Sequence, residues 1–299
     1  MKCIIVGLGN IGTKRLEVNK NQIVATVDPN NKLADYKKLD NVKYNSYDTA
    51  ILSCPEDQKI GYIQKLLKLK KNVLVEKPLL SKNTNKLKDI FKKFQEKKLL
   101  LYIAYNLRFE PHIIKAKKIL DKKTLGKIYY CEYSYLNGTS LNNKKSIWKT
   151  KIKIGVIHDL LPHLIDLHHY LLGKKVDKSY MKNIYKIESK NPDHAYFFFK
   201  KNRINFRISY LCWKNEFKVK IVGSKGDLEL SGLSKWGKTK LILRNRIIPS
   251  GKPIEKIIKT NKINDTHLNE YNFLKKAVNK KTYIKNDTTF IINEFINNY

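Results

Sequence analysis

A glycine turn directly after an apolar run constrains the fold of this chain more than any other feature. Residues 1–6 are apolar β-formers apart from Lys2, and they lead into GLGNIG, with glycines at 7, 9 and 12. In such a turn the first glycine permits a tight bend, the second lets the backbone approach a pyrophosphate, and the third lets helix and strand pack closely. Phosphate oxygens would lie at the helix N-terminus, where N–H groups favour negative charge. The segment predicts a dinucleotide site.

An acidic residue after the second apolar segment supports this interpretation. Residues 22–27 are predicted to form a strand that ends in Asp28, sixteen residues beyond Gly12. A carboxylate near this position accepts hydrogen bonds from the adenosine ribose hydroxyls in dinucleotide-binding folds. The absence of an arginine directly after it favours NAD over NADP, although Lys32 lies nearby. The alternative is that residues 28–31 form an ordinary polar turn.

The rest of the N-terminal third alternates between strand and helix patterns, which is typical of a doubly wound α/β domain with a parallel sheet. In such sheets ligands bind beyond the carboxyl ends of the strands. We therefore expect four residues that follow strand ends to border one crevice: Gly7, Asp28, Ser53 and Lys77. Further strands are predicted at 49–54, 72–75 and 99–103, and helices at 11–19, 32–39, 60–69 and 81–98.

Lys77 is the candidate for chemistry in this part of the chain. It lies in Glu76-Lys77-Pro78, directly after a predicted strand. An ammonium group at the rim of a cofactor crevice can bond a substrate hydroxyl and stabilise a developing oxyanion. The local sequence alone favours one more surface lysine among many, so the assignment depends on the other motifs.

The densest collection of chemical groups is GVIHDLLPHLIDLHHYLLG at 155–173. Asp159 and His163 are four residues apart, a spacing that places them on one face of a helix. Pro162 is compatible with a helix if it lies in the first turn with Asp159 near the N-cap, and Gly173 suits a C-cap. A histidine beside a carboxylate can act as an acid/base group with a fixed tautomer.

Two alternatives stay open for this segment. One is a helix whose polar face merely contains histidines. The other is a metal site built from His163, Asp166 and either His158 or His168, although no second ligand cluster accompanies it.

The remaining residues predict a second domain based on a large, mostly antiparallel open sheet. The pattern indicates a helix at 111–120 and a polar loop at 138–153 that carries Trp148. One sheet face would stay exposed in a single chain, which favours a homo-oligomer. Strands are predicted at 128–136, 195–199, 204–210, 217–222 and 227–230, with a turn at 223–226, a helix at 266–279 and a last helical segment after it.

The bulk composition adds one rival interpretation. A formal net charge of +35 is typical of nucleic-acid-binding proteins, but the lysines are spread along the chain, and we interpret most of them as a solvated surface. The four cysteines form no C-x-x-C pair and indicate neither a disulfide framework nor a zinc site. With neither a signal-peptide pattern nor an apolar stretch of membrane length, we expect a cytoplasmic protein.

Four motifs in order along the chain resemble the glucose–fructose oxidoreductase, inositol dehydrogenase and MocA family: GLGNIG at 7–12, SCP at 53–55, EKP at 76–78 and YNLRFEP at 105–111. The resemblance implies an N-terminal Rossmann domain at 1–104 and a substrate-binding and oligomerisation domain at 105–299. It implies an NAD(P)-dependent oxidoreductase that moves a hydride between nicotinamide and a carbinol or keto carbon of a sugar or nucleotide sugar. The segment with THLNE at 266–270 is similar to members of surface-polysaccharide pathways.

The resemblance also assigns roles to residues. Lys77, Asp159 and His163 are the expected catalytic residues. No metal is expected. The expected cofactor-binding residues are Gly7, Gly9, Asn10, Ile11, Gly12, Asp28, Ser53, Pro55, Glu76, Lys77 and Asn106. The expected substrate-binding residues are Lys77, Arg108, Trp148, Asp159 and His163.

The chain departs from the family pattern at the start of the histidine segment. Only Gly155 remains of a glycine triplet, and His158 occupies a position that is commonly apolar. This leaves the substrate class open. A non-catalytic dinucleotide-binding sensor or assembly protein with the same fold is the other function that we consider.

Overall fold

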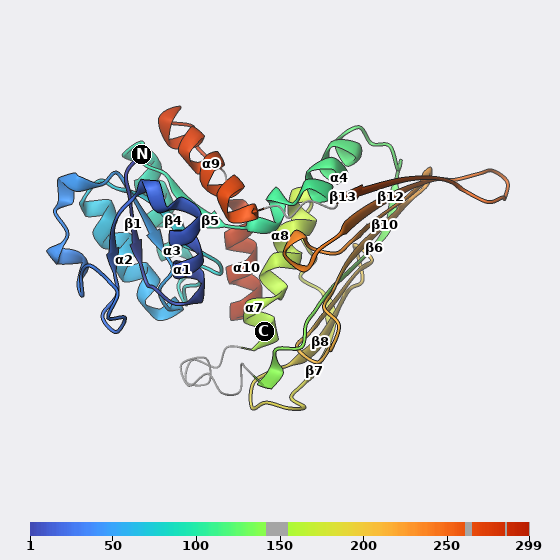
Figure 1. Ribbon diagram of the computed structural model, residues 1–299. Coiled ribbons are helices and arrows are strands. Elements are labelled where there is room, and N and C mark those ends of the chain that lie inside the picture. The colour runs from blue at the N-terminus through green and yellow to red at the C-terminus, as the bar shows by residue number, and fades with distance from the viewer. Residues whose placement is uncertain (142–154, 261–264, 285, 299) are drawn as a thin grey trace. The chain divides into compact units, whose positions relative to one another are not determined.

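A five-stranded parallel sheet organises the N-terminal part of the chain (Figure 1). The computed structural model describes residues 1–141, 155–260, 265–284 and 286–298. The strand order is β2-β1-β3-β4-β5, and all neighbours are parallel. The chain moves from β1 outward to β2 and then returns to β3 on the other side of β1, which places the topological switch point between β1 and β3. The strands are β1 (Cys3–Val6), β2 (Ile23–Val27), β3 (Thr49–Leu52), β4 (Asn72–Glu76) and β5 (Leu101–Ala104).

Helices cover both faces of this sheet. Successive strand side chains point to opposite faces, so one set of side chains packs with α1 and α9, and the alternate set faces α2 and α3. The cluster on the α9 face includes Cys3, Ile5, Ile51, Leu74, Tyr102, Tyr271 and Leu274. The helices of this unit are α1 (Asn10–Asn19), α2 (Glu56–Lys68), α3 (Thr84–Glu96), α9 (Thr266–Asn279) and α10 (Asp287–Asn297).

The division of the chain into units differs from the expected boundary at residue 104. The structure groups Met1–Asn106 with Thr266–Tyr299, and Leu107–Asp265 form the second unit. The physical reason is burial: the apolar face of α9 completes the core over β1 and β5, and α10 packs on α3, where the Phe91 and Phe290 ring centroids are 5.2 Å apart. These two helices were expected in the second domain, residues 105–299.

The points where the chain leaves and re-enters the first unit are joined by a hydrogen bond. The Asn106 side-chain amide donates to Thr266 Oγ1 at 3.1 Å. The second unit is therefore inserted between two residues of the first unit, Asn106 and Thr266, that are neighbours in space.

The helix predicted at 32–39 is wrong. This stretch is fully described, and it contains turns followed by a short 3₁₀ segment, Leu39–Asn41. Asp28 accepts the backbone N–H groups of Asn30 and Asn31 at 2.8 Å each, and Asp35 accepts that of Thr26 at 2.8 Å. Short acidic side chains that capture nearby backbone donors favour turns over a helix.

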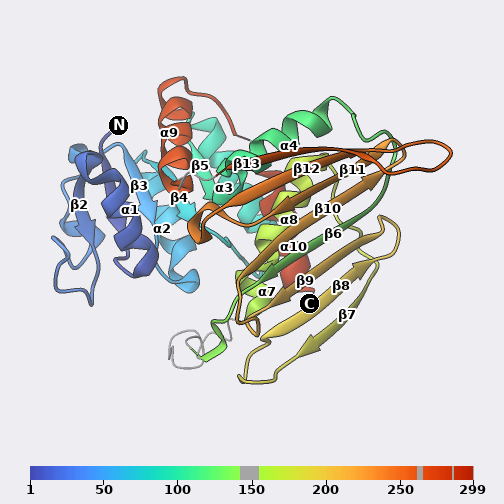
Figure 2. The ribbon, with the colours of Figure 1, turned by 45° about the vertical axis from the view of Figure 1, so that its right-hand side comes forward.

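The second unit contains an eight-stranded sheet in the order β13-β12-β11-β10-β6-β9-β8-β7 (Figure 2). Only the β6–β9 pair is parallel within this sheet, which confirms the mostly antiparallel sheet. The strands β7, β12 and β13 were not predicted from the sequence. The strands are β6 (Ile128–Leu136), β7 (Tyr180–Tyr185), β8 (His194–Phe199), β9 (Ile204–Ser209), β10 (Glu216–Gly223), β11 (Gly226–Ser231), β12 (Thr239–Asn245) and β13 (Ile254–Thr260).

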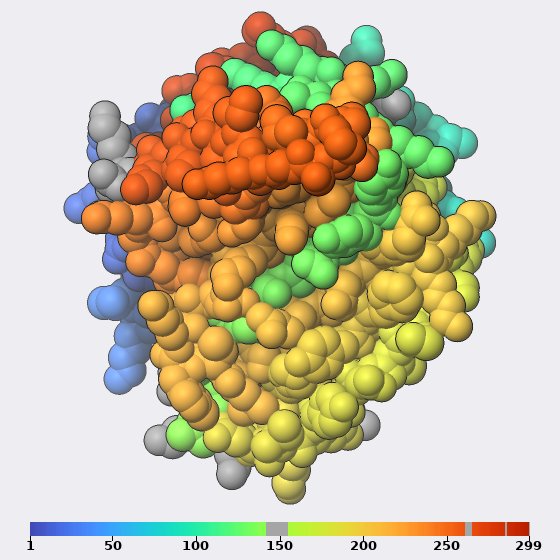
Figure 3. Space-filling view, turned by 90° about the vertical axis from the view of Figure 1, so that its right-hand side faces the viewer, coloured from blue at the N-terminus to red at the C-terminus, as the bar shows by residue number. Residues whose placement is uncertain are grey.

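The two faces of this sheet differ. One face contacts α4 (Pro111–Asp121), α7 (Val156–Asp159) and α8 (Leu161–Leu172). In the part of the chain that the structure describes, no helix covers the other face, where strands from β13 to β7 reach the surface (Figure 3). Large side chains exposed there on β7 and β8 are Met181, Tyr185, Tyr196 and Phe198.

Two leucines of α9 test whether this helix belongs to the core of the first unit. Leu274 is fully buried, whereas Leu268 is 39% exposed. We expect Leu274→Ala to lower the free energy of unfolding by about 2–5 kcal/mol, because a cavity replaces buried methyl groups. Leu268→Ala is the matched control and should change it by about 1 kcal/mol or less. Urea unfolding followed by far-UV circular dichroism measures both, and equal losses would contradict the placement of α9.

Candidate functional site

The turn between β1 and α1 is packed too closely for side chains at two of its glycines. Gly7 has φ +95°, and a Cβ there would lie 2.7 Å from the Ser53 and Cys54 backbone. A Cβ at Gly12 would lie 1.9 Å from the Gly7 carbonyl oxygen. At Gly9 a Cβ would meet nothing within 4 Å, so the space beside this residue is open. This is the arrangement that a pyrophosphate needs.

The N-terminus of α1 offers donors to an anion. Gly9 is the N-cap, and the helix has neither a side-chain cap nor an acidic residue in its first turn. Asn10 and Ile11 begin the helix, and the Thr13 N–H makes a helical bond to the Gly9 carbonyl at 2.9 Å. Amides before Thr13 in the first turn have no intrahelical acceptor by geometry. The residues present therefore fit the diphosphate of a dinucleotide.

Asp28 is held as an ionised carboxylate directly after β2. Its Oδ2 accepts the Leu8 N–H at 2.7 Å, and its Oδ1 accepts two further backbone N–H groups. Partial burial alone would raise the pKa of Asp28, but these hydrogen bonds, with Leu8 the strongest, lower it below its usual value. A carboxylate has about four acceptor positions in total, and three are used here, so about one remains for a ribose hydroxyl.

Ser53 lies at the switch point beside the glycine turn. Its N–H donates to the Val6 carbonyl at 2.8 Å, and its Cβ is 3.5 Å from where a Gly12 Cβ would be. Its Oγ is buried and has no hydrogen-bond partner among the residues that the structure describes. A buried hydroxyl of this kind suits a polar ligand. Pro55 follows as the N-cap of α2.

The predicted residues follow the carboxyl ends of neighbouring parallel strands. The sheet therefore brings most of the expected cofactor-binding residues to one edge. In sheet order these positions are Asp28 after β2, Gly7 after β1, Ser53 after β3, Lys77 after β4 and Asn106 beyond β5.

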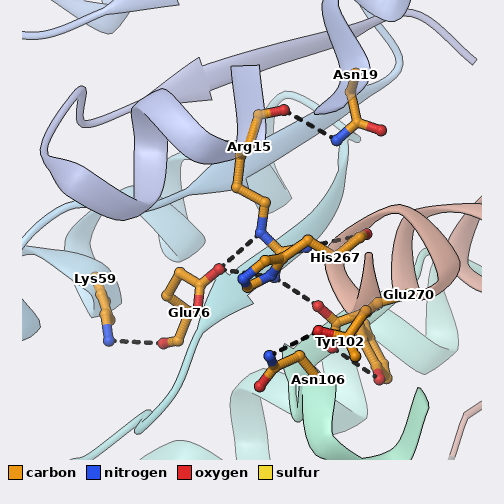
Figure 4. A network of polar contacts seen from close by, with 9 residues as sticks. Arg15, Asn19, Lys59, Glu76, Tyr102, Asn106, His267 and Glu270 are labelled. Carbon is orange, nitrogen blue, oxygen red and sulfur yellow. Dashed lines mark hydrogen bonds and ion pairs between the residues drawn. The ribbon is translucent and has the colours of Figure 1, made fainter. Parts of the chain in front are cut away.

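Glu76 makes contacts that the sequence analysis did not anticipate. Its carboxylate accepts Arg15 Nε at 2.8 Å, and Arg15 Nη2 lies 2.7 Å from Glu76 and 2.5 Å from Glu270 Oε2. Arg15 is fully buried on α1, and Glu270 is fully buried on α9 (Figure 4). The Glu76 side chain is thus directed to a structural ion-pair network, and its predicted role toward the cofactor stays a prediction.

The pKa values of the two carboxyl groups in this network are shifted in opposite directions. Burial raises the pKa of Glu270 to about 7, even though Arg15 acts against the rise. Burial acts in the same direction on Glu76, but Arg15, followed by His267, outweighs it and lowers the pKa of Glu76 below its usual value. One guanidinium between two buried acids keeps only one of them strongly ionised.

The histidine segment of the second unit forms two short helices. Gly155 is the N-cap of α7, and a Cβ there would lie 2.5 Å from the Pro192 carbonyl oxygen. The helix that was predicted with Asp159 near its N-cap is α8, which starts at Leu161 with Leu160 as its N-cap, and Asp159 is the last residue of α7. The positions of Pro162 in the first turn of α8 and of Gly173 as its C-cap, with φ +66°, are confirmed.

Side chains distant in sequence surround Asp159 and His163. The Tyr210 hydroxyl donates to Asp159 Oδ2 at 2.9 Å, and the ring centroids of His163 and Tyr135 are 5.7 Å apart. Lys235 Nζ donates to the Tyr135 hydroxyl at 3.0 Å. No local sequence pattern indicated Tyr135, Tyr210 and Lys235, because only the sheet brings them to α7 and α8.

Two of these groups have shifted pKa values. Burial, followed by the charge of Asp159, raises the pKa of Tyr210 well above its usual value. Burial lowers the pKa of Lys235, against the opposing effect of Asp159 and Glu110. Tyr210 therefore remains a hydrogen-bond donor to Asp159 across the physiological pH range.

Arg108, which is partly exposed, forms an ion pair with the buried Asp166 of α8. Its Nε lies 2.9 Å from Oδ2, and its Nη2 contacts Oδ1, so the pair is bidentate. The expected role of Arg108 toward substrate stays a prediction, and Trp148 lies outside the described residues. Within the described ranges, no group of three or more His, Cys, Asp or Glu side chains is arranged to hold a metal ion.

A pH series tests the carboxyl pair at Arg15. The folded-state pKa of Glu270, about 7, lies above its usual 4.5. The protonated form of Glu270 therefore contributes to the free energy of unfolding below about pH 4.5, and this contribution is lost as the pH rises to about 7. Glu76, whose pKa is lowered, gives the opposite trend only at lower pH.

We expect Tm to fall less between about pH 5 and 8 in Glu270→Gln than in the wild type. Glu17→Gln is the control, since Glu17 is exposed and lies on α1, the helix that carries Arg15. Its Tm should change with pH as in the wild type. An equal change of Tm with pH in all three proteins would contradict the raised pKa of Glu270.

Comparison with known proteins identifies the family. Residues 1–105 match the family model described as "Oxidoreductase family, NAD-binding Rossmann fold", and residues 117–288 match "Oxidoreductase family, C-terminal alpha/beta domain". No helix in the described ranges is long and apolar enough to cross a membrane.

Curated relatives match part of the chain. Levoglucosan dehydrogenase of Pseudarthrobacter phenanthrenivorans is 28% identical over 108 residues, which cover 35% of this chain and 27% of the relative. Inositol 2-dehydrogenase of Rhizobium meliloti is 21% identical over 128 residues, which cover 43% of this chain and 37% of the relative. The matched stretches thus span well under half the length of these relatives.

Solved structures share the fold over nearly the whole chain. UDP-N-acetylglucosamine 3-dehydrogenase from Acidithiobacillus ferrooxidans has a TM-score of 0.80 at 16% identity and covers 99% of this chain and 95% of that one. A levoglucosan dehydrogenase in complex with NADH has a TM-score of 0.83 at 14% identity and covers 100% of this chain and 95% of that one. As its motifs predicted, the chain belongs to the Gfo/Idh/MocA oxidoreductase family and begins with an NAD-binding Rossmann domain.

Proposed function

We propose that this protein is an NAD-dependent oxidoreductase that transfers a hydride between nicotinamide and a carbinol or keto carbon of a sugar or nucleotide sugar. The observation that carries the proposal is the row of strand-end residues at one sheet edge. In this row the open α1 N-terminus, the ionised Asp28 and the unpartnered Ser53 Oγ fit a dinucleotide. Asp28 favours NAD over NADP, because an ionised acid suits a ribose hydroxyl and repels a ribose phosphate.

The proposed chemistry divides between the two units. NAD, when bound, supplies the hydride acceptor or donor. The Lys77 ammonium donates to the substrate oxygen and stabilises charge that develops there. A ring nitrogen of His163 takes or gives the hydroxyl proton, and Asp159 orients the imidazole. Asp159, which accepts the Tyr210 hydroxyl, is kept in place for this role.

The names of the relatives support a sugar-like substrate. Levoglucosan and inositol are polyols or sugar derivatives, and one structural neighbour acts on a UDP-linked sugar. The net charge of +35 favours an anionic, nucleotide-linked substrate over a neutral one. We propose on this basis a cytoplasmic step in surface-polysaccharide sugar synthesis.

Two substitutions test the proposed function. We expect Lys77→Met and His163→Asn each to lower kcat by about 10²-fold or more, with a small change in the Kd of NAD. The measurement is the absorbance of reduced nicotinamide with a panel of sugars and UDP-sugars, with NAD and NADP compared. Lys82→Met, at an exposed lysine close in sequence, is the matched control. Dinucleotide binding with activity unaffected by either variant would instead favour a non-catalytic sensor or assembly protein.

The exposed face of the second sheet supports a further part of the proposal, a homo-oligomer. Met181 pairs with Phe198 across β7 and β8, and Tyr185 and Tyr196 lie on the same face. All four are at least 36% exposed in the single chain. A second copy that covers this face would remove contiguous apolar surface from water.

Light scattering coupled to size-exclusion chromatography tests this arrangement. We expect the wild type to elute as a dimer or tetramer, and the double variant Tyr196→Glu/Phe198→Glu to shift to smaller species, because buried unpaired charges oppose association. Trp213→Glu, at a residue that is 77% exposed outside the strands, is the control. A monomeric wild type would reject the proposal.

A further inference from the structure

One buried lysine outside the predicted site holds the backbone around Lys77. Lys59 of α2 is only 3% exposed. Its Nζ donates to Glu56 Oε2 at 2.6 Å, to the Glu76 carbonyl at 2.6 Å and to the Pro78 carbonyl at 2.7 Å. Figure 4 shows Lys59 directed at the Glu76 backbone. An ammonium has three donors, and all three are used here.

Two of these acceptors flank Lys77. The carbonyls of residues 76 and 78 precede and follow the residue whose side chain the proposed reaction uses. Hydrogen bonds from a charged donor are roughly twice as strong as neutral ones. Lys59 therefore restrains two peptide units at once, the 76–77 unit directly before Lys77 and the 78–79 unit that follows Pro78.

The rest of the segment is held in a related way. Glu56, the ion-pair partner of Lys59, accepts the Leu80 N–H through Oε1 at 2.7 Å. The Ser81 N–H donates to Asn293 Oδ1 of α10 at 2.7 Å. The buried Lys59 and the partly exposed Glu56 thus form one ion pair at the start of α2 that binds residues 76–80 through three backbone contacts.

Packing alone does not account for a charged pair at this position. A buried ion pair contributes little net stability compared with apolar residues of similar volume, because both charges lose their hydration. An apolar residue at 59 would fill the space but leave two carbonyls without this donor. The charged pair instead fixes the orientation of a particular stretch of backbone.

We propose that Lys59 is a positioning residue, which orients Lys77 by fixing the backbone of residues 76–78. The inference rests on the proposed function, since it takes Lys77 as the group that stabilises the reacting oxygen. Lys59 itself touches neither substrate nor cofactor in this scheme. Displacement of a catalytic group by about 1 Å can lower the rate by about 10², and this sets the size of the expected effect.

The first test measures the segment without any cofactor. Lys59→Met in the full chain removes the three donors and keeps an unbranched side chain as long as the aliphatic part of lysine. We expect amide hydrogen exchange at Lys77 and at residues 79–81 to accelerate by about tenfold or more. Lys65→Met on the same helix is the matched control, since Lys65 pairs with Asp40 at a side chain that is 39% exposed. Unchanged exchange in Lys59→Met overturns the proposal.

The second test separates positioning from general stability. We expect Lys59→Met to lower kcat by about 10–100-fold, with the Kd of NAD nearly unchanged and a larger primary deuterium isotope effect on kcat. In the Lys77→Met background the same substitution should have no further effect, because both changes act on one group. Additive losses in this double-mutant cycle, or full activity of Lys59→Met, overturn the proposal.

Glu56→Gln tests the same role if Lys59→Met does not fold. Glu56→Gln keeps Lys59 but weakens its charged partner, and we expect a several-fold loss of kcat that disappears in the Lys77→Met background. No loss in Glu56→Gln then overturns the proposal. The two levels of inference are distinguishable: full activity of Lys77→Met rejects the proposed function, whereas inactive Lys77→Met with fully active Lys59→Met rejects only the positioning role.

Discussion

The first unit depends on one buried guanidinium. Arg15 of α1 binds Glu76 at the end of β4 and Glu270 of α9, three elements that lie far apart in the sequence. Without this cation the Glu76 carboxylate would lose its counter-charge beside the buried Glu270, and uncompensated buried charge is strongly destabilising. The same contact therefore joins α9, whose apolar face packs on the sheet, to the end of β4 directly before Lys77.

This contact also relates the proposed cofactor site to the proposed reacting group. Helix α1 presents its uncapped N-terminus beyond Gly9 and, one turn after Gly12, carries the arginine that holds Glu76. Helix α2 acts on the opposite side of the same segment through Lys59. The edge of a parallel sheet is a set of loops, and loops position catalytic groups only when other elements restrain them. Here the restraint comes from buried charges on the two helices that follow β1 and β3.

The sequence was informative where structure depends on local patterns. The glycine spacing predicted the β1–α1 turn, and the alternation at 128–136 predicted β6 with the bounds that the structure has. It was misleading at 32–39, where lysines compatible with a helix lie among turns held by Asp28 and Asp35. In the second sheet the patterns of β12 and β13 were obscured by their polar residues.

The contacts that complete the candidate site could not be predicted, because they depend on tertiary neighbours. Arg15 meets Glu270 across 255 residues, and Tyr210 meets Asp159 across 51. Lys59 looks like any other lysine in a helix with several of them. Its buried position is decided by the path of the chain after β4, which no local pattern encodes.

The hydrogen bond between Asn106 and Thr266 has a consequence for the modularity of the protein. It brings the exit and the re-entry of the chain to neighbouring positions, 3.1 Å apart between side-chain atoms. Residues 107–265 are thus a cassette within an otherwise continuous Rossmann domain. A short linker from Asn106 to Thr266 would close the remaining chain without displacing α9, and every contact of Arg15 would be retained. The contacts within the Rossmann unit therefore do not require the inserted residues between its two segments.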